Sequence, residues 1–439
     1  MGLLIAFIIF ILCMIGALIL GVSLVLPLLV GLVLFTFLGL RKGFPLKQLA
    51  AWSWGSIKDS LIVILVMLSI GFLTAAWRVC GTITVFVYYG MMVIIPPLFL
   101  LITYLLSSLL SYAIGTSFGV AGTLGVIFMA LARSGGVDPV LTAGVLLSGI
   151  YFGDRGSPVS SSANMVAGVT KTEILPNVRL MMKSGLLPLL VTTGIYAVLS
   201  VTHPISHVDP QIIAAFEREF SLSVWAFVPA VLMLLLPLLK IGIFISIGAS
   251  VVSAVLVAWL VQGVPLLQVI QTCVIGYHST GEGLGAILDG GGLVSMVEIA
   301  MILVISCAYS GIFSGTDMLR DIQSLLVKGC RRFGRYAVTL IVGLLSSVIF
   351  CNQTIATLMC NDLMTKPYLD TGGSRQELAI DMENTLIVMV GLIPWCIACS
   401  VPLAFFNVGP AAVPYACYLY IVPLSYFFTK RRWFVNRAA

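Results

Sequence analysis

Long stretches of this 439-residue chain contain no charged residue, and this feature restricts the fold more than any other. The longest uncharged stretches cover residues 2–40, 79–132, 220–239, 241–281 and 384–429. A helix that crosses a bilayer needs about 20 mainly apolar residues, so several stretches can hold two spans. Segments of alternating polarity, which a membrane β-barrel requires, are absent from the sequence. The sequence therefore predicts an all-α, polytopic membrane protein with about 11–13 spans.

The uncharged stretches also suggest how the chain is organised. We expect helices near residues 3–20, 22–39, 60–78, 84–106, 138–155, 180–200, 222–239, 241–260, 295–315, 335–350, 376–392 and 409–428. A first unit, residues 1–200, would contain an additional N-terminal span, and an acidic linker, residues 201–220, would join it to a second unit, residues 221–439.

Short matches between the two units indicate a duplication. The tripeptide Leu-Leu-Ser occurs at residues 109–111 and again at 344–346, and Pro158 corresponds to Pro394 at nearly the same offset. Transporters often contain inverted repeats with broken helices and a binding site near the bilayer midplane. Corresponding loops of the two units differ in charge, which favours opposite orientations. The basic C-terminal tail does not fit this arrangement, because it would then lie outside the cell.

The net charge of +6 comes from basic residues in short loops and does not indicate a nucleic-acid partner. Because such loops usually face the cytoplasm, we expect a multi-pass protein of the inner cell membrane, in contact with lipid. The sequence contains no zinc-protease, Walker or nucleophile-elbow motif, so no enzymatic activity is predicted. Without an ATP-binding segment, any transport would be driven by an ion gradient.

Two polar stretches lie inside apolar surroundings and are predicted to form re-entrant hairpins. The first hairpin, about residues 107–134, contains Thr116 and Ser117 among four glycines, and the second, about residues 350–368, contains Asn352, Gln353 and Thr354. Polar groups and bent backbone are tolerated at membrane depth where they line a protein-enclosed cavity. Close packing of helices through small residues is the alternative explanation for the glycines.

Asp154 lies where a helix is expected to break, in the segment GIYFGDRGSPVSSSANMVAG, residues 149–168. Pro158 disfavours helical geometry at the preceding residue and lacks an amide donor, while the serines after it are good N-caps. The two half-helices would leave a polar gap suited to a small ion, where Asp154 supplies a fixed charge. Alternatively, Asp154 and Arg155 cap a helix at the membrane surface, with Arg155 facing lipid headgroups, or pair with other charges.

Glu383 is the candidate second acid, because it opens the last long apolar stretch just before the break expected at Pro394. The alternative is that Glu383 and its neighbours Asp381 and Asn384 stabilise a helix N-terminus through the helix dipole. Both Asp154 and Glu383 are candidate sodium ligands.

Three places in the chain resemble the NhaC family of sodium/proton antiporters, within the wider ion-transporter superfamily. They are the segment GTSFGVAGTLGV at residues 115–126, the segment around Asp154, and the segments NQTIATLM and ENTLIVMVGLIPW at 352–359 and 383–395. The resemblance implies inverted repeats, two hairpins and an elevator-type carrier that exchanges sodium for protons by alternating access, without a cofactor other than these coupling ions.

The resemblance also carries over individual site residues. In the first unit these are Asp154, Ser157, Ser160 and Asn164, and in the second unit Asn352, Gln353, Thr354, Glu383 and Thr385. Where the family commonly has Ser-Asp-Thr-Thr, this chain has Ser160-Ser161-Ser162-Ala163, so a second carboxylate near Asp154 is missing. A carrier of a small organic solute, such as malate, lactate or an amino acid, therefore remains the alternative. Elevator carriers are often dimers, which makes a homodimer a candidate assembly.

Overall fold

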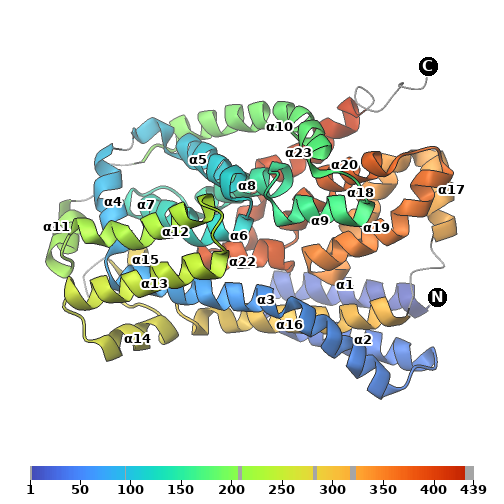
Figure 1. Cartoon of the computed structure of the whole chain (residues 1–439), viewed down its shortest axis with the longest axis horizontal. Helices are drawn as coiled ribbons and strands as arrows, with labels where there is room; N and C mark the ends of the chain where they lie inside the picture. Colours follow the sequence, from blue (N-terminus) through green and yellow to red (C-terminus); the bar gives the residue numbers. More distant parts are fainter. Residues whose placement is uncertain (1, 94, 206–209, 280–283, 317–322, 431–439) are drawn as a thin grey trace.

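The computed structural model describes residues 2–93, 95–205, 210–279, 284–316 and 323–430 (Figure 1). Within these ranges the chain forms helices and loops, with one isolated antiparallel bridge between Tyr277 and Gly290. Six helical segments are long and apolar enough to cross a membrane, or eight if each of two bent pairs is one span. Shorter apolar helices of 10–17 residues accompany them. The protein is thus an all-helical, multi-pass membrane protein, with fewer full-length spans than the sequence predicts.

The helices form two tiers (Figure 1). The lower tier contains α1 (Gly2–Leu20), α2 (Val25–Arg41), α3 (Leu46–Val79), α13 (Ile243–Leu260), α14 (Leu266–Ile275) and α16 (Val297–Thr316). Helices α3 and α16 run antiparallel in close contact, since a Cβ on Gly311 would lie 2.3 Å from the Trp52 carbonyl oxygen and one on Gly71 2.5 Å from the Met296 side chain. The hairpin of α12 (Val228–Leu238) and α13 joins this tier through α3.

The upper tier contains the broken helices. It comprises α5 (Phe99–Ile114), α8 (Pro139–Gly156), α9 (Ser161–Thr170), α10 (Ile174–Thr202), α18 (Arg335–Phe350), α19 (Gln353–Asp370), α20 (Arg375–Asn384) and α23 (Cys417–Thr429). Helices α6 (Ser117–Val120) and α22 (Ile397–Phe405) lie toward the middle of the view, and α7 (Val126–Ser134) lies to their left. The remaining helices are α4 (Thr82–Val93), α11 (Pro210–Glu219), α15 (Gly285–Leu288), α17 (Gln323–Phe333) and α21 (Leu386–Met389).

Two predicted spans differ from the observed helices, and one observed helix was not predicted. The span predicted at 84–106 is two helices, because Ile95 before Pro96 is extended, with ψ 111°, and ends the helical geometry. Helix α3 begins at Leu46 rather than near residue 60, since the charged residues Lys58 and Asp59 point to the outside of a continuous helix. Helix α14 was not predicted, because its ten residues are too few for a span.

Helix breaks recur at one offset along the chain. Helix α5 ends at Gly115, with φ 75°, and Thr116 caps the next helix; α18 ends at Cys351, with φ 54°, and Asn352 caps α19. The two caps have nearly identical backbones, with φ and ψ of −141° and 124° at Thr116 and −136° and 123° at Asn352. The N-cap positions of α9 and α22, Ser160 and Cys396, are separated by the same 236 positions.

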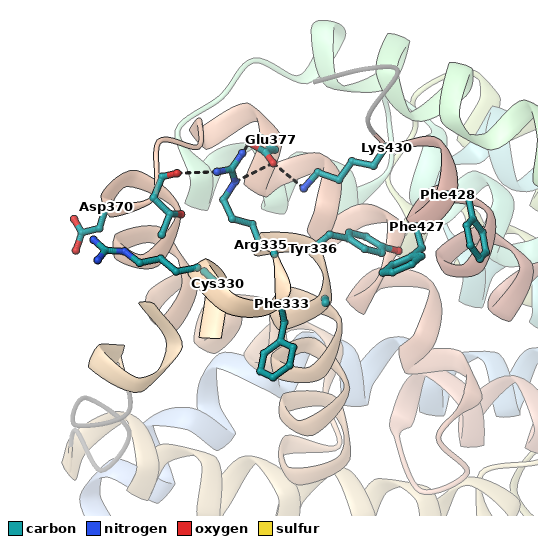
Figure 2. A pocket seen from close by; sticks show the side chains of 13 residues that line it. Cys330, Phe333, Arg335, Tyr336, Asp370, Glu377, Phe427, Phe428 and Lys430 are labelled. Carbon is teal, nitrogen blue, oxygen red and sulfur yellow. Dashed lines mark hydrogen bonds and ion pairs between the residues drawn. The ribbon is translucent and has the colours of Figure 1, made fainter. Parts of the chain in front are cut away.

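The C-terminal helix ends beside the basic loop that precedes α18. Glu377 forms an ion pair with Arg335 at 3.0 Å and another with Lys430 at 2.7 Å (Figure 2). The basic segment before α18 and the start of the basic tail therefore lie at one end of the molecule. The turn between α2 and α3 also lies at this end in Figure 1. Lys430, at the end of α23, thus lies on the same side of the molecule as the basic segment before α18 and the turn between α2 and α3.

Candidate functional site

A break between α8 and α9 places Asp154 at the end of a half-helix. Helix α8 ends at Gly156, Ser157 is extended with ψ 137°, and α9 starts at Ser161 after the N-cap Ser160. The Ser160 hydroxyl oxygen accepts from the amides of Ser162 and Ala163, at 3.1 and 3.3 Å, and the hydroxyl donates to the Asp154 carbonyl at 2.5 Å. The predicted break is thus present, and Ser160 holds its two ends together.

The C-terminal end of α5 packs directly on this break. A Cβ on Gly153 would lie 2.0 Å from the Ser111 carbonyl carbon, and one on Gly115 2.6 Å from the Val159 carbonyl carbon. The Ser157 hydroxyl donates to the Tyr112 carbonyl at 2.6 Å. Glycine is required at these two positions because no side chain fits between the backbones. The first predicted hairpin therefore contacts the Asp154 segment through its own break.

The Asp154 carboxylate is buried, with 2% of the residue exposed, and is surrounded by neutral donors. The Ser162 hydroxyl lies 3.0 Å from each carboxylate oxygen, and Nε2 of Gln353, at the start of α19, donates to Oδ2 at 3.0 Å. Asp154 forms no ion pair with any described residue. Residues from both halves of the chain thus meet at one carboxylate whose charge has no fixed counter-ion.

A cavity of about 710 Å³ opens beside Asp154, at the boundary between the two tiers. Its polar lining contains the side chains Thr116, Ser117, Asp154, Ser161, Ser162, Gln353, Thr354 and Thr357. The wall contributed by the lower tier is apolar on α3, at Ile62, Val63 and Val66, and includes the turn between α12 and α13. Hydroxyl and carboxylate oxygens are the ligands that hard cations such as sodium prefer. The cavity can therefore hold a cation next to Asp154.

The structure brings five of the predicted site residues to this cavity and places the others behind it. Those at the cavity are Asp154, Thr116, Ser117, Gln353 and Thr354. Ser157, Ser160, Asn164 and Asn352 instead hold backbone: Asn164 donates to the carbonyls of Pro158 and Ser160, and Asn352 accepts from the amides of Thr354 and Ile355. These four residues shape the two breaks.

Glu383 and Thr385 lie on the break between α20 and α21, outside the cavity lining. Glu383 is 1% exposed, and neither carboxylate oxygen has a hydrogen-bond partner. It lies within electrostatic range of Arg155 and Asp154. The Thr385 hydroxyl donates to the Asp381 carbonyl at 2.6 Å. A buried carboxylate without partners is costly to keep charged, so Glu383 is distinct from the hydrogen-bonded Asp154.

Arg155 does not face lipid headgroups, contrary to the alternative expectation given for it above. It is 1% exposed and donates to the Tyr418 hydroxyl, the Met181 carbonyl, the Ser184 hydroxyl and the Asn384 side-chain oxygen, at 2.5–3.0 Å. Because its partners lie on three other helices, Arg155 ties α8 to α10, α20 and α23. It makes no contact with the Asp154 carboxylate.

Four polar residues at the cavity were not among the predicted site residues: Ser161, Ser162, Lys240 and Thr357. Ser162 was recognised only as a candidate N-cap, although it begins the second half-helix opposite Asp154. Thr357 lies one helical turn after Gln353 on α19, so an i, i+4 pattern could have identified it. Lys240 carries a clear signal in the sequence, since it is the one charged residue between positions 220 and 281.

A buried acid at a helix break, beside a polar cavity in a multi-pass helical protein, is typical of an ion-coupled membrane transporter. Comparison with known sequences identifies the kind of transporter. The chain belongs to the Na+/H+ antiporter family, whose sequence model matches residues 149–429. This family includes the NhaC antiporters, which confirms the resemblance described above.

Characterised members of the family carry different cargoes. This chain is similar to the Malate-2H(+)/Na(+)-lactate antiporter of Bacillus subtilis (strain 168), with 28% identity covering 86% of this chain and 84% of that protein. The Na(+)/H(+) antiporter NhaC of the same organism is 26% identical, covering 91% and 90%. The Arginine/ornithine antiporter ArcD of Halobacterium salinarum is 29% identical, covering 87% and 81%. The chain is thus a secondary antiporter by family, and the family name alone does not give its substrate.

Proposed function

We propose that the protein is an ion-gradient-driven antiporter that exchanges sodium for protons, with Asp154 as the group that binds either ion. The observation that carries this proposal is the buried Asp154 carboxylate, which borders the cavity and has only neutral hydrogen-bond donors. A single carboxylate can hold a proton or a sodium ion but not both, so binding of one releases the other. This competition is the chemical basis of exchange.

The neighbouring side chains can complete a sodium site. A hydroxyl group both donates and accepts hydrogen bonds. Ser162 can therefore donate to the Asp154 carboxylate and can also turn a lone pair toward a bound cation. The hydroxyls of Thr116, Thr354 and Thr357 line the same cavity. We propose that Glu383 takes part in proton binding from a deeper position, because its unpartnered carboxylate is stable there when it is protonated.

Alternating access would follow from movement of the upper tier against the lower tier. The cavity lies between Asp154, on the upper tier, and α3 with the α12–α13 turn, on the lower tier. The recurrence of helix breaks at an offset of 236 positions supports two repeats, about residues 1–200 and 221–439, of inverted orientation. In this proposal an elevator-type movement carries Asp154 across the membrane, and a homodimer would anchor the lower tier.

The basic end of the molecule would face the cytoplasm of a cell whose inner membrane contains the protein. Arg335 and Lys430 lie together at this end, whereas Glu217 and Glu219 belong to α11, at the opposite end in Figure 1. The positive-inside rule then supports a cytoplasmic C-terminus. Labelling of single cysteines introduced at the C-terminus and in α11 of intact cells tests this orientation.

Exchange by purified protein in proteoliposomes tests the function. An outward sodium gradient should acidify the lumen of vesicles that contain the natural protein, as a pH-sensitive dye inside reports. Asp154→Asn should abolish this signal. Asp138→Asn, at the N-cap of the same helix, should leave it intact, because asparagine is an equally good cap. Unchanged exchange in Asp154→Asn would exclude Asp154 from ion binding.

Coupled exchange of a small organic solute is the second candidate function, and the size of the cavity favours it. A volume of about 710 Å³ far exceeds the ~30 Å³ that one water molecule occupies in the liquid. The relatives named as malate/lactate and arginine/ornithine antiporters show that organic cargo occurs in similar proteins. Uptake of labelled malate, lactate, arginine and ornithine into the same vesicles distinguishes the two candidates.

A further inference from the structure

Lys240 occupies an unusual position in the sequence and in the fold. It is the one charged residue between positions 220 and 281. It lies in the four-residue turn between α12 and α13, whose helices are strongly apolar. Lys240 is exposed, and an ionisable residue between two apolar helices of a membrane protein is a candidate functional group.

The backbone of Lys240 carries a cost. Its φ of 63° places it in the left-handed region, which glycine adopts far more readily than lysine. The turn therefore retains a lysine where a glycine would relieve strain. A left-handed residue is common just after a helix C-terminus, so glycine is a well-tolerated replacement at this position.

The turn forms part of the wall of the Asp154 cavity. Among the residues lining this cavity, Lys240 is the one basic residue and Asp154 is the one acid. They belong to different tiers, so the cavity carries one fixed charge of each sign on its two sides. A sodium ion or a proton alone needs only the carboxylate, and a nearby ammonium group would disfavour cation binding.

Lys240 also differs from the other buried or cavity-lining cations of the protein in having no partner. Its ammonium group forms no hydrogen bond or ion pair with any residue in the described ranges. Arg155, in contrast, donates to four groups, and Lys430 pairs with Glu377 and Asp381. Because Arg155 and Lys430 already have partners within the protein, Lys240 is the group available for an anion that enters the cavity.

We infer that Lys240 binds the carboxylate of a small organic substrate in this cavity, while Asp154 holds the coupling cation. The inference rests on the proposed antiport function and assigns its substrate class: organic acids, including amino acids, of a size that the cavity admits. A carboxylate and a cation bound together leave the cavity with no net charge added, which lowers the cost of carrying both through the membrane. The alternative, a lysine that only reaches for the membrane surface, predicts no effect on substrate binding.

Binding of carboxylates to the purified, full-length protein tests this inference. L-lactate, L-malate and L-ornithine are titrated in buffer with sodium, and the apparent Kd is obtained from the shift in thermal unfolding. At least one of the three should bind to the natural protein. Lys240→Gln should weaken that binding by about tenfold or more, since it removes a charge-assisted hydrogen bond, whereas Lys240→Arg should keep it within about threefold.

Two further variants make the result decisive. Lys240→Gly suits the left-handed backbone, so it should fold at least as well as the natural protein and show the same loss of binding as Lys240→Gln. Lys171→Gln is the matched control: Lys171 is also exposed and left-handed, with φ 56°, but lies outside this cavity, so binding should not change. Equal Kd values in Lys240→Gln, Lys240→Gly and the natural protein would overturn the inference.

Failure of this inference can be separated from failure of the proposed function. If none of the three carboxylates binds, but sodium-driven proton movement without any carboxylate is present and depends on Asp154, the role of Lys240 is rejected and sodium/proton antiport stands. If carboxylate binding depends on Lys240 while sodium and proton movements are uncoupled, the inference stands and the sodium/proton proposal fails.

Discussion

The two buried aspartates Asp154 and Asp381 differ in what surrounds the carboxylate. Asp154 contacts a serine hydroxyl and a glutamine amide, both neutral. Asp381 contacts the ammonium group of Lys430 and the hydroxyls of Tyr368 and Tyr426. Both residues are almost fully buried. A carboxylate that is already paired with a lysine has a low affinity for a sodium ion. A carboxylate with only neutral donors can take up and release a cation.

The cavities near these two aspartates show that size does not locate the ion site. The cavity at the basic end has about 860 Å³, more than the 710 Å³ beside Asp154. Its buried acid, Glu377, is held by cations: Arg335 and Lys430 both point to Glu377 in Figure 2, and Arg335 also donates to the Thr371 carbonyl. This cluster joins α18, α20 and α23 at one end of the protein. We interpret it as a structural clamp, in contrast to the exchangeable charge at Asp154.

The largest expected effect separates the clamp from the ion site. Lys430→Met leaves Asp381 buried without its cation, which should lower the free energy of unfolding by about 3 kcal/mol. The control Lys366→Met removes an exposed lysine on α19 that forms no hydrogen bond or ion pair with a described residue, and it should cost little. Thermal unfolding in detergent measures both. Adding Asp381→Asn to Lys430→Met should restore part of the loss, and a loss below about 1 kcal/mol in the single variant would contradict the clamp interpretation.

The second prediction concerns sodium binding itself. Replacement of potassium by sodium should stabilise the natural protein against thermal unfolding, because the ion binds the folded state. Asp154→Asn should weaken this sodium effect by about 100-fold or more, since it removes the negative charge that holds the cation. Lys430→Met should retain the natural sodium dependence at its lower melting temperature. If both variants lost sodium binding equally, the distinction between the two aspartates would be wrong.

The third prediction tests the neutral surroundings of Asp154. Ser162→Ala should raise the sodium KM of exchange about tenfold, because it removes the hydroxyl that lies 3.0 Å from both carboxylate oxygens. Ser161→Ala is the matched control, since Ser161 lines the same cavity without a hydrogen bond to Asp154. Proton flux is measured as a function of sodium concentration in proteoliposomes. An equal rise in KM for the two variants would indicate a general effect of polarity rather than a specific ligand.

Local features of the site could be predicted from the sequence, because their causes are local. The break after Asp154 follows from Pro158 and the N-cap Ser160, and both appear within six residues. The break at Gly115 and Thr116 has a similar origin, in a left-handed glycine followed by a capping hydroxyl. Proline, glycine and capping residues determine backbone geometry whatever surrounds them.

Features that depend on distant contacts could not be predicted in this way. The partners of Arg155 lie 26 to 263 positions away in the sequence. The ion pair between Lys430, at the end of α23, and Glu377 joins distant parts of the sequence, and no local sequence pattern predicts it. Lys240 was visible as an isolated charge, but its place at the Asp154 cavity depends on how the α12–α13 hairpin packs against α3. Helix packing of this kind follows from the whole fold.

The smallest expected effect distinguishes two adjacent residues at the second break. Asn352 caps α19 by accepting from the amides of Thr354 and Ile355 and does not line the cavity, whereas its neighbour Gln353 lines it and donates to Asp154. Asn352→Ala should therefore cost about 1 kcal/mol of stability and leave the sodium KM within about twofold. Gln353→Ala should raise the sodium KM several-fold with the cap intact. Asn352→Ala could instead shift the sodium KM as strongly as Gln353→Ala. The capping backbone itself would then belong to the ion site. In that case, residues that shape the break could not be separated from residues that bind the ion.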